Sequence, residues 1–219
     1  GAAYHQTERG NMTSENIDTV QGKGVINGPH TVRVDDQEYE GKNIVIGTGL
    51  SPCDLDIPGG EYAITNNEFF DLDQLPKRAV VIGGGYVALE LATILQAAGS
   101  EVTIFQHSDR LLRPFDQEMV GTLQQIMEDR GIVFHLNAPV KKITKTNGAY
   151  TVTTVDGEGF DTDLVINAAG RKPNVEEIGL EEMGVEFDLN KGVKVNEHMQ
   201  TTIPSIFAAG DVADNGQPN

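Results

Sequence analysis

The sequence predicts an α/β protein with a parallel β-sheet, and three observations support this prediction. Short apolar runs alternate with stretches of helical periodicity over residues 78–136. A glycine-rich turn joins the first apolar run to the first helical stretch, as in a strand–helix–strand unit. Hairpin signals such as Asn147-Gly148 follow this part, so we expect an antiparallel segment there.

The first part of the chain, residues 15–50, is expected to form short strands. Residues 31–34 and 39–46 flank the turn Asp35-Asp36, which is a hairpin pattern. The end of the second run, residues 43–46, has three consecutive apolar residues after Asn43 and predicts a buried strand that leads into two glycines.

The middle part begins with a connection, residues 51–77, that is rich in Pro, Gly and Asp and predicts one short helix near residues 67–70. Residues 78–82, 102–105 and 132–136 then predict three strands separated by two helices. Right-handed crossovers place both helices on one face of a parallel sheet, which is half of a doubly wound dinucleotide fold.

Each of the two helices has an expected apolar face. The face of the first helix, which Gly99 ends, consists of Val87, Leu91, Ile94, Leu95 and Ala98. The face of the second helix, which Asp116 caps, consists of Met119, Val120, Leu123, Ile126 and Met127. We expect both faces to pack on the sheet.

An antiparallel meander is expected to interrupt the parallel sheet. Residues 140–146 and 149–155 alternate apolar and polar side chains, and Asn147-Gly148 between them favours a tight hairpin turn. Residues 164–166 are apolar throughout, so the chain is expected to return to the sheet as a buried strand.

The glycine turn before the first helix predicts a dinucleotide site. Gly83 permits the tight turn, Gly85 lets a pyrophosphate approach the backbone, and the small Ala88 lets the helix pack on the strand. The helix N-terminus supplies partial positive charge, which a chain of formal net charge −17 otherwise lacks. Tyr86 and Val87 lie on the first helical turn and are counted among the candidate cofactor-binding residues.

The type of nicotinamide coenzyme stays open at this stage. An acidic residue at the end of the second strand would favour NAD, whereas basic residues would favour NADP. Gln106 stands at this corner and can bond a ribose hydroxyl without repelling a phosphate. The neighbours able to contact a phosphate are His107, Ser108, Arg110 and Arg113, although the two arginines can equally be solvated surface charges. We expect both coenzymes to bind, with a selectivity below about 100-fold.

Four segments resemble a known family. Residues 80–91, with the sequence VVIGGGYVALEL, resemble the NAD(P)H motif of the pyridine nucleotide–disulfide oxidoreductases, which include glutathione reductase, dihydrolipoamide dehydrogenase and mercuric reductase. Residues 46–49 are similar to the segment where the family's chain leaves its FAD domain. Residues 167–174 resemble the return segment, and residues 206–211 resemble the second FAD motif. The order and spacing of these segments match over nearly the whole chain.

The resemblance implies a Rossmann-like FAD/NAD(P)-binding fold, in which an antiparallel β-meander forms one crossover of a parallel sheet. It implies an NAD(P)H-binding domain over residues 51–170, flanked by two pieces of a split FAD domain, residues 1–50 and 171–219. The family's first FAD glycine motif, its Cys-x-x-x-x-Cys redox pair and its C-terminal dimerisation domain have no counterpart in this sequence, and Cys53 is interpreted as structural. We therefore expect a fragment of a longer flavoprotein.

The resemblance also implies roles for single residues. Tyr86 resembles the gate over the nicotinamide pocket, and Glu90 resembles the carboxylate that reaches toward the nicotinamide carboxamide; these are the candidate catalytic residues. An ordinary surface aromatic and a solvated glutamate are the alternatives. Asp211 resembles the ligand of the flavin ribitol, and Gly49 and Gly170 lie in the two junction segments and are expected at the cofactors. One carboxylate will not retain FAD, so we expect the purified chain to be colourless.

Composition excludes several classes of partner. The net charge of −17 repels nucleic acid and anionic membranes. No apolar run approaches the roughly 20 residues of a membrane helix, and the start of the sequence has no signal peptide pattern. The single cysteine, Cys53, excludes an internal disulfide and a Cys-rich metal site. We expect a cytoplasmic protein without metal, a homodimeric parent and a monomeric fragment.

Two functions follow from these observations. The first is the NAD(P)H-binding portion of an FAD-dependent oxidoreductase whose parent passes hydride from NAD(P)H to flavin. The alternative is a non-catalytic dinucleotide-binding module, such as a redox sensor. Asp211 favours the first for the parent, because a sensor of NAD(H) has no use for a flavin ligand. The isolated chain is expected to bind dinucleotide without turnover.

Overall fold

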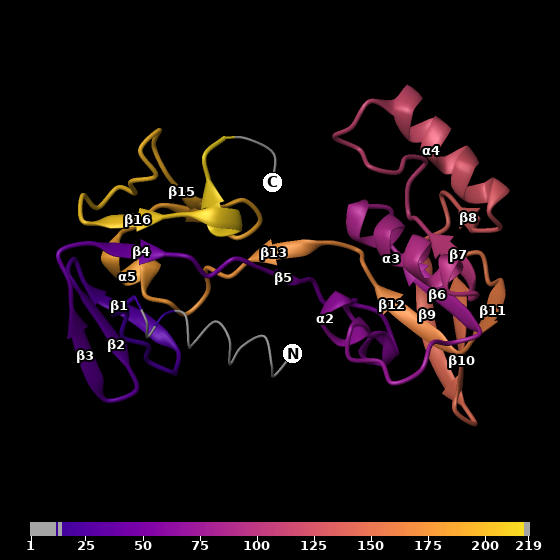
Figure 1. The fold of residues 1–219 in the computed structure, drawn as a ribbon, viewed down its shortest axis with the longest axis horizontal. Coiled ribbons are helices and arrows are strands. Elements are labelled where there is room, and N and C mark those ends of the chain that lie inside the picture. Colours follow the sequence, from indigo (N-terminus) through magenta and orange to yellow (C-terminus); the bar gives the residue numbers. More distant parts are fainter. Residues whose placement is uncertain (1–11, 13–14, 217–219) are drawn as a thin grey trace. The chain divides into compact units, whose positions relative to one another are not determined.

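The computed structural model describes residues 12 and 15–216, which fall into two compact units (Figure 1). The central unit comprises Pro52–Arg171. The split unit combines the described residues up to Ser51 with those from Lys172 onward. The boundaries fall within β5 (Leu50–Pro52) and β13 (Arg171–Pro173), which pair in a two-stranded sheet. Among the described helices, none combines the length and the hydropathy that crossing a bilayer requires.

A four-stranded parallel sheet forms the middle of the central unit. Its strands are β6 (Arg78–Ile82), β7 (Glu101–Phe105), β8 (Val133–His135) and β12 (Leu164–Asn167), in the order β12-β6-β7-β8. All three pairings are parallel. The predicted parallel sheet is confirmed. Strand β12, which is distant from β6 in the sequence, pairs directly with it.

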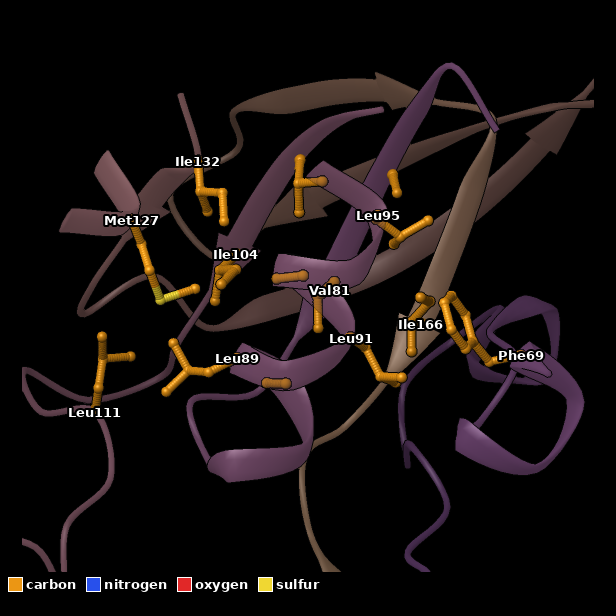
Figure 2. Close-up of a cluster of buried hydrophobic side chains, with 14 of the residues drawn as sticks. Phe69, Val81, Leu89, Leu91, Leu95, Ile104, Leu111, Met127, Ile132 and Ile166 are labelled. Carbon is orange, nitrogen blue, oxygen red and sulfur yellow. The ribbon is translucent and has the colours of Figure 1, made fainter. Parts of the chain in front are cut away.

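Helices cover one face of this sheet. The long helices α3 (Tyr86–Ala97) and α4 (Gln117–Asp129) lie there together with the short helix α2 (Asn66–Phe69). Thr65 and Glu68 form a capping box at the N-terminus of α2. The buried side chains of these helices meet one face of β6, β7 and β12 (Figure 2). The cluster consists of Phe69, Ala79, Val81, Ala88, Leu89, Leu91, Ala92, Leu95, Val102, Ile104, Leu111, Val120, Met127, Ile132 and Ile166.

The predicted meander covers the other face of the sheet. It consists of β9 (Val140–Thr146), β10 (Ala149–Thr154) and β11 (Gly159–Thr162), with β10 in the middle and both pairings antiparallel. Side chains that alternate with those of the helical face, such as Val80, pack there against the fully buried Val152. The sheet is therefore buried on both faces, as its apolar strands require.

The expected helix faces are only partly correct. In α3, Ile94 is 45% exposed, while Ala88, Leu89 and Ala92 are buried in addition to the expected Leu91 and Leu95. In α4, only Val120 and Met127 are buried; the exposed members of its expected face are Met119, Leu123 and Ile126. A periodic pattern shows which residues share a face, but the extent of its burial depends on what the fold places against it.

The split unit begins with an antiparallel sheet of β1 (Gly24–Gly28), β2 (Thr31–Val34) and β3 (Gln37–Glu40). The predicted hairpin between β2 and β3 is confirmed, with Asp35 in the left-handed region at φ 52°. The expected single strand over residues 39–46 is wrong, because strand β3 ends at Glu40 and a new strand begins only at Ile44.

The second half of that run, β4 (Ile44–Ile46), joins a different sheet, where it pairs in parallel with β16 (Ile206–Ala208). The expectation that residues 43–46 are buried is only partly correct, because Val45 is 65% exposed. Ile46 and Ile206 belong to the second core, that of the split unit. The remaining elements are η1 (Gly60–Tyr62) in the central unit, and α5 (Leu180–Met183), β14 (Phe187–Asp188), β15 (Gly192–Lys194), η2 (Gly210–Val212) and β17 (Ala213–Asp214) in the split unit.

Candidate functional site

The candidate site lies at the carboxyl edge of the parallel sheet, where β6 runs into the glycine turn. Gly83 has φ +131°, and a Cβ atom there would lie 2.1 Å from the carbonyl oxygen of Ala168, which follows β12. The Gly83 N–H donates to the carbonyl of Phe105 at 2.8 Å. Only glycine fits this position, and the turn is held between the ends of the neighbouring strands β7 and β12.

The N-terminus of α3 is open to an anion. Its N-cap, Gly85, has extended backbone at φ −86° and ψ 179°, and a Cβ atom there would meet nothing within 4 Å. No side chain caps the helix, and its first turn carries no acidic residue. The neighbouring α4 differs, because the carboxylate of Asp116 accepts from the N–H groups of Glu118 and Met119. The first N–H groups of α3 can therefore donate to an anionic ligand at the positive end of the helix dipole.

An apolar hollow of about 160 Å³ adjoins this turn on the meander side of the sheet. Its lining residues come from five segments of the central unit: Leu55, Ile57, Ile82, Gly83, Phe105, Gln106, His107, Ala138, Pro139, Val140 and Ala169. The ring of Phe105 stacks on His135 at a centroid distance of 4.8 Å and meets Phe160 edge-on, which fixes one wall. The hollow therefore offers a small apolar surface beside the glycine turn.

The corner after β7 carries the residues expected to distinguish the coenzymes. His107 and Arg113 are exposed, and Nη2 of Arg113 donates to Nε2 of His107 at 3.3 Å. Gln106 is only 5% exposed, and its Nε2 donates to Ser108 Oγ and to the Arg110 carbonyl, both at 2.9 Å. The structure thus brings His107 and Arg113 together and turns Gln106 inward.

The two candidate catalytic residues lie on α3. Tyr86 is its first residue and is 49% exposed, and Glu90 is exposed one turn later. Residues four apart share one face of a helix, so both side chains project from the same face. Val87, between them, is half-buried and packs against the helical core.

The remaining predicted residues are divided between the units. Gly170 follows β12 in the central unit at φ +152°, and its carbonyl accepts from the N–H of Cys53 at 2.9 Å. In the split unit, Gly49 and Asp211 come after the parallel strands β4 and β16, at their common carboxyl edge. Gly49 is at φ +66°, and Asp211 is exposed in η2.

Sequence reasoning missed most of the lining of the hollow. Leu55 and Ile57 lie in a segment expected to be mere connection, and Pro139 and Val140 come from the start of the meander. Their apolar character was the only signal, and it is equally typical of core residues. The five segments that line the hollow are distant in the sequence, so only the fold brings them together.

Comparisons with known proteins place the chain in one family. The family model described as pyridine nucleotide-disulphide oxidoreductase matches residues 3–219. The chain is 37% identical over 206 residues to the chloroplastic/mitochondrial glutathione reductase of Pisum sativum, with 93% of this chain and 37% of the relative covered. It is 34% identical over 203 residues to the glutathione reductase of Burkholderia cepacia, with 93% and 45% covered.

A solved structure has the same fold. The HOCl-induced flavoprotein disulfide reductase RclA from Escherichia coli superposes with a TM-score of 0.83 at 28% identity, with 90% of this chain and 46% of that chain covered. The chain therefore spans less than half the length of these relatives.

Proposed function

The chain belongs to the pyridine nucleotide-disulphide oxidoreductase family, and from this premise we propose that its central unit is the NAD(P)H-binding domain of an FAD-dependent oxidoreductase. The observation that carries the proposal is the N-terminus of α3, which lacks a capping side chain and an acidic first turn, and which follows the open Gly85. On a chain with a net charge of −17, backbone amides and a helix dipole are the means of holding a diphosphate.

The hollow beside the glycine turn is proposed to receive the adenine ring. At about 160 Å³ it is smaller than the roughly 300–1,000 Å³ of a site that encloses a whole ligand. It is, however, large enough for one flat aromatic ring. Walls such as Phe105 and Val140 are apolar, so they favour the faces of the ring, while the diphosphate stays at Gly85.

The two ends of the coenzyme are assigned to different side chains. His107 and Arg113 stand at the corner after β7 and are proposed to meet the 2′ end of the adenosine ribose. Tyr86 is proposed to cover the nicotinamide, and Glu90 to bind its carboxamide, because both project from the first turns of α3. These residues bind and orient the ring, and a suitably held nicotinamide can release hydride from one face.

FAD, which the family uses, would accept this hydride. The described part of the split unit fits FAD only in part. It offers Asp211 and Gly49 at one sheet edge, but its helices in the described range are single turns, such as α5 with four residues. Such short helices supply little dipole for a second diphosphate. Flavin reduction is therefore proposed for a longer parent protein, with Gly170 in the segment that connects the two units.

Titration calorimetry with NADH and NADPH tests the proposal directly. We expect one coenzyme per chain and a purified protein without a flavin absorption band. A chain that binds neither coenzyme at millimolar concentration would contradict the assignment of the central unit. A near-stoichiometric flavin band would contradict the partial fit of the split unit.

The second candidate function is dinucleotide binding without catalysis, as in a redox sensor. The contrast between the long, open α3 and the short helices of the split unit favours this behaviour for the chain by itself. NADH oxidation with a dye acceptor, measured with and without added FAD, separates the two functions. Turnover at ordinary enzyme rates, about 1 per second or more, would exclude the second.

A further inference from the structure

We propose that Gln106 is a positioning residue for coenzyme selection, which holds a loop in place and does not itself bind the ribose. The loop comprises residues 107–113 and is called the corner loop below. This inference rests on the proposed coenzyme site and deepens it. Its starting point is that the residue at the ribose corner is nearly inaccessible, with 5% of its surface exposed.

The side-chain amide of Gln106 is occupied by the corner loop. Both protons of Nε2 are used, one by Ser108 Oγ and one by the Arg110 carbonyl, each at 2.9 Å. A carbonyl can only accept, so the atom that faces it must be the amide nitrogen. The Ser108 hydroxyl donates to the same Arg110 carbonyl at 3.3 Å. Gln106 therefore closes a small ring of hydrogen bonds inside the loop.

Gln106 also touches the glycine turn. A Cβ atom on Gly84 would lie 2.8 Å from Cδ of Gln106, so the amide packs directly on this glycine. The Gly84 carbonyl accepts from the N–H of Leu112 at 2.8 Å. Leu112 has φ 43°, a left-handed conformation that a leucine adopts only when its surroundings impose it. The corner loop is thus fastened to the diphosphate turn at two points.

The consequence falls on His107 and Arg113. Arginine can only donate, so Nε2 of His107 accepts from it at 3.3 Å. Both side chains are exposed, and the loop that carries them is held by Gln106 and Leu112. A phosphate on the ribose would meet a preset arginine, whereas a ribose hydroxyl gains little from it.

The test is Gln106→Leu, which keeps the size of the side chain and removes its donors. In this variant Gln106 no longer holds the corner loop, so Arg113 must become ordered when the phosphate binds. We therefore expect affinity for NADPH to fall at least about fivefold more than affinity for NADH. If Gln106 instead bound the ribose hydroxyl, NADH would lose more than NADPH. That result, or an equal loss for both, overturns the proposal.

Gln96→Leu is the matched control. Nε2 of Gln96 also donates to a backbone carbonyl at 2.9 Å, that of Arg130, where α4 ends. The control removes the same kind of bond away from the glycine turn and should leave the NADPH to NADH ratio unchanged. A shift of the ratio in this variant as large as that in Gln106→Leu would assign the effect to general loosening and overturn the proposal.

A second measurement needs no coenzyme. In Gln106→Leu, amide hydrogen exchange should accelerate at residues 110–113, including the Leu112 N–H, while β6 and β7 stay protected. Unchanged exchange in the loop overturns the positioning role even if both coenzymes bind. If the loop loosens but the unaltered chain binds neither coenzyme, the positioning contact holds and the proposed function alone fails.

Discussion

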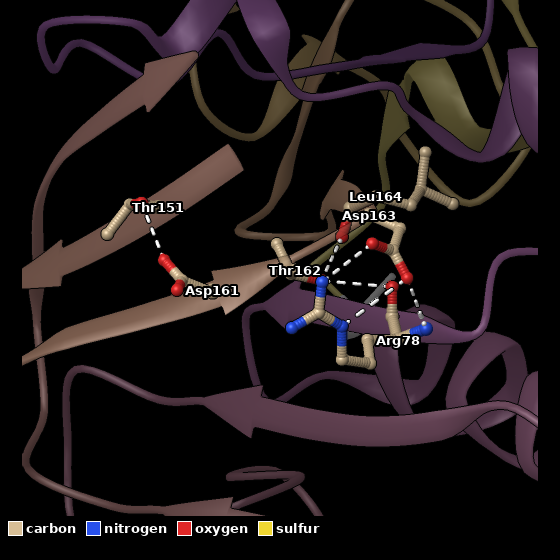
Figure 3. Close-up of polar contacts among 6 residues, drawn as sticks. All are labelled: Arg78, Thr151, Asp161, Thr162, Asp163 and Leu164. Carbon is tan, nitrogen blue, oxygen red and sulfur yellow. Dashed lines mark hydrogen bonds and ion pairs between the residues drawn. The ribbon is translucent and has the colours of Figure 1, made fainter. Parts of the chain in front are cut away.

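Asp163 accepts three hydrogen bonds from Arg78, two from the guanidinium at 2.8 and 3.4 Å and one from the backbone N–H at 3.0 Å (Figure 3). Arg78 begins β6, and Asp163 immediately precedes β12. The Thr162 hydroxyl adds a bond to the Arg78 carbonyl at 3.0 Å. Strands β6 and β12, which lead to Gly83 and Gly170, are therefore fixed in register at their amino ends. The candidate site lies at their opposite, carboxyl ends.

The pair gives a pH-dependent contribution to stability. Hydrogen bonding from the Arg78 side chain lowers the pKa of the Asp163 carboxyl, although partial burial opposes the shift. A lowered pKa in the folded chain means that the contribution is complete above the unfolded pKa of about 3.9 and is lost as the pH falls through the folded pKa.

Asp163→Asn should therefore lower the thermal midpoint at pH 7 by roughly 1–3 °C, since both side chains are more than a third exposed. The difference from the unaltered chain should shrink below about pH 4. A double-mutant cycle with Arg78→Met isolates the pair. A difference that grows toward low pH would contradict the assignment.

Gly83 and Gly85, two of the three glycines of the turn, should respond differently to alanine. At Gly83, the left-handed φ of +131° and the 2.1 Å approach to Ala168 predict a loss of roughly 2–6 kcal/mol in unfolding free energy. At Gly85, the space is open, and an alanine N-cap costs about 1 kcal/mol. Gly85→Ala should nevertheless weaken NADH binding by tenfold or more, because its methyl group would face the proposed diphosphate site. A stable Gly85→Ala chain with unchanged affinity would place the diphosphate elsewhere.

Features encoded by neighbouring residues could be predicted from the sequence. The glycine turn, the cap at Asp116 and the hairpin at Asn147-Gly148 each depend on a few consecutive residues, and all three form as expected. The handedness rule predicted that both helices cover one face of the sheet. The order β6-β7-β8 agrees with the tendency of consecutive strands to be neighbours.

Features that depend on distant segments could not be predicted. Gln106 is polar and stands at a strand end, which suggested a ribose contact, but its orientation depends on a loop that folds back over Gly84. The apolar hollow likewise needs Leu55, which precedes β6 in the chain, to meet Pro139, which follows β8. Periodicity cannot supply such convergence, because it contains no information on long-range contacts.

Adjacent residues of α3 offer a test of its observed face. Leu95 is completely buried between α3 and the sheet, whereas Ile94 is 45% exposed. Leu95→Ala should cost about 2–5 kcal/mol in unfolding free energy, and Ile94→Ala less than about 1 kcal/mol. Urea denaturation of the two variants in parallel measures the difference. Equal losses would mean that the helix is rotated from its described position.

The N-cap residue Asp116 should contribute measurably to the stability of α4. Asp116 accepts from the N–H groups of Glu118 and Met119, at 3.0 and 3.1 Å, and the helix buries only Val120 and Met127. Asp116→Ala should cost about 1 kcal/mol and accelerate amide exchange in the first turn of α4. Asp116→Asn keeps an acceptor and should behave like the unaltered chain. Rapid exchange in both variants would show that charge, and not the hydrogen bond, stabilises this helix end.

Coenzyme selectivity should be low in either direction. The residue that follows β7, Gln106, is neutral, and Glu101 lies at the other end of the strand. Arg113 favours a phosphate, but it is exposed, so water screens much of its attraction. We expect the dissociation constants of NADH and NADPH to differ by less than about 100-fold, or about 2.7 kcal/mol. Arg113→Gln should weaken NADPH binding several-fold and leave NADH within about twofold. Parallel calorimetric titrations measure all four constants, and a larger preference in the unaltered chain would require a coenzyme contact beyond His107 and Arg113.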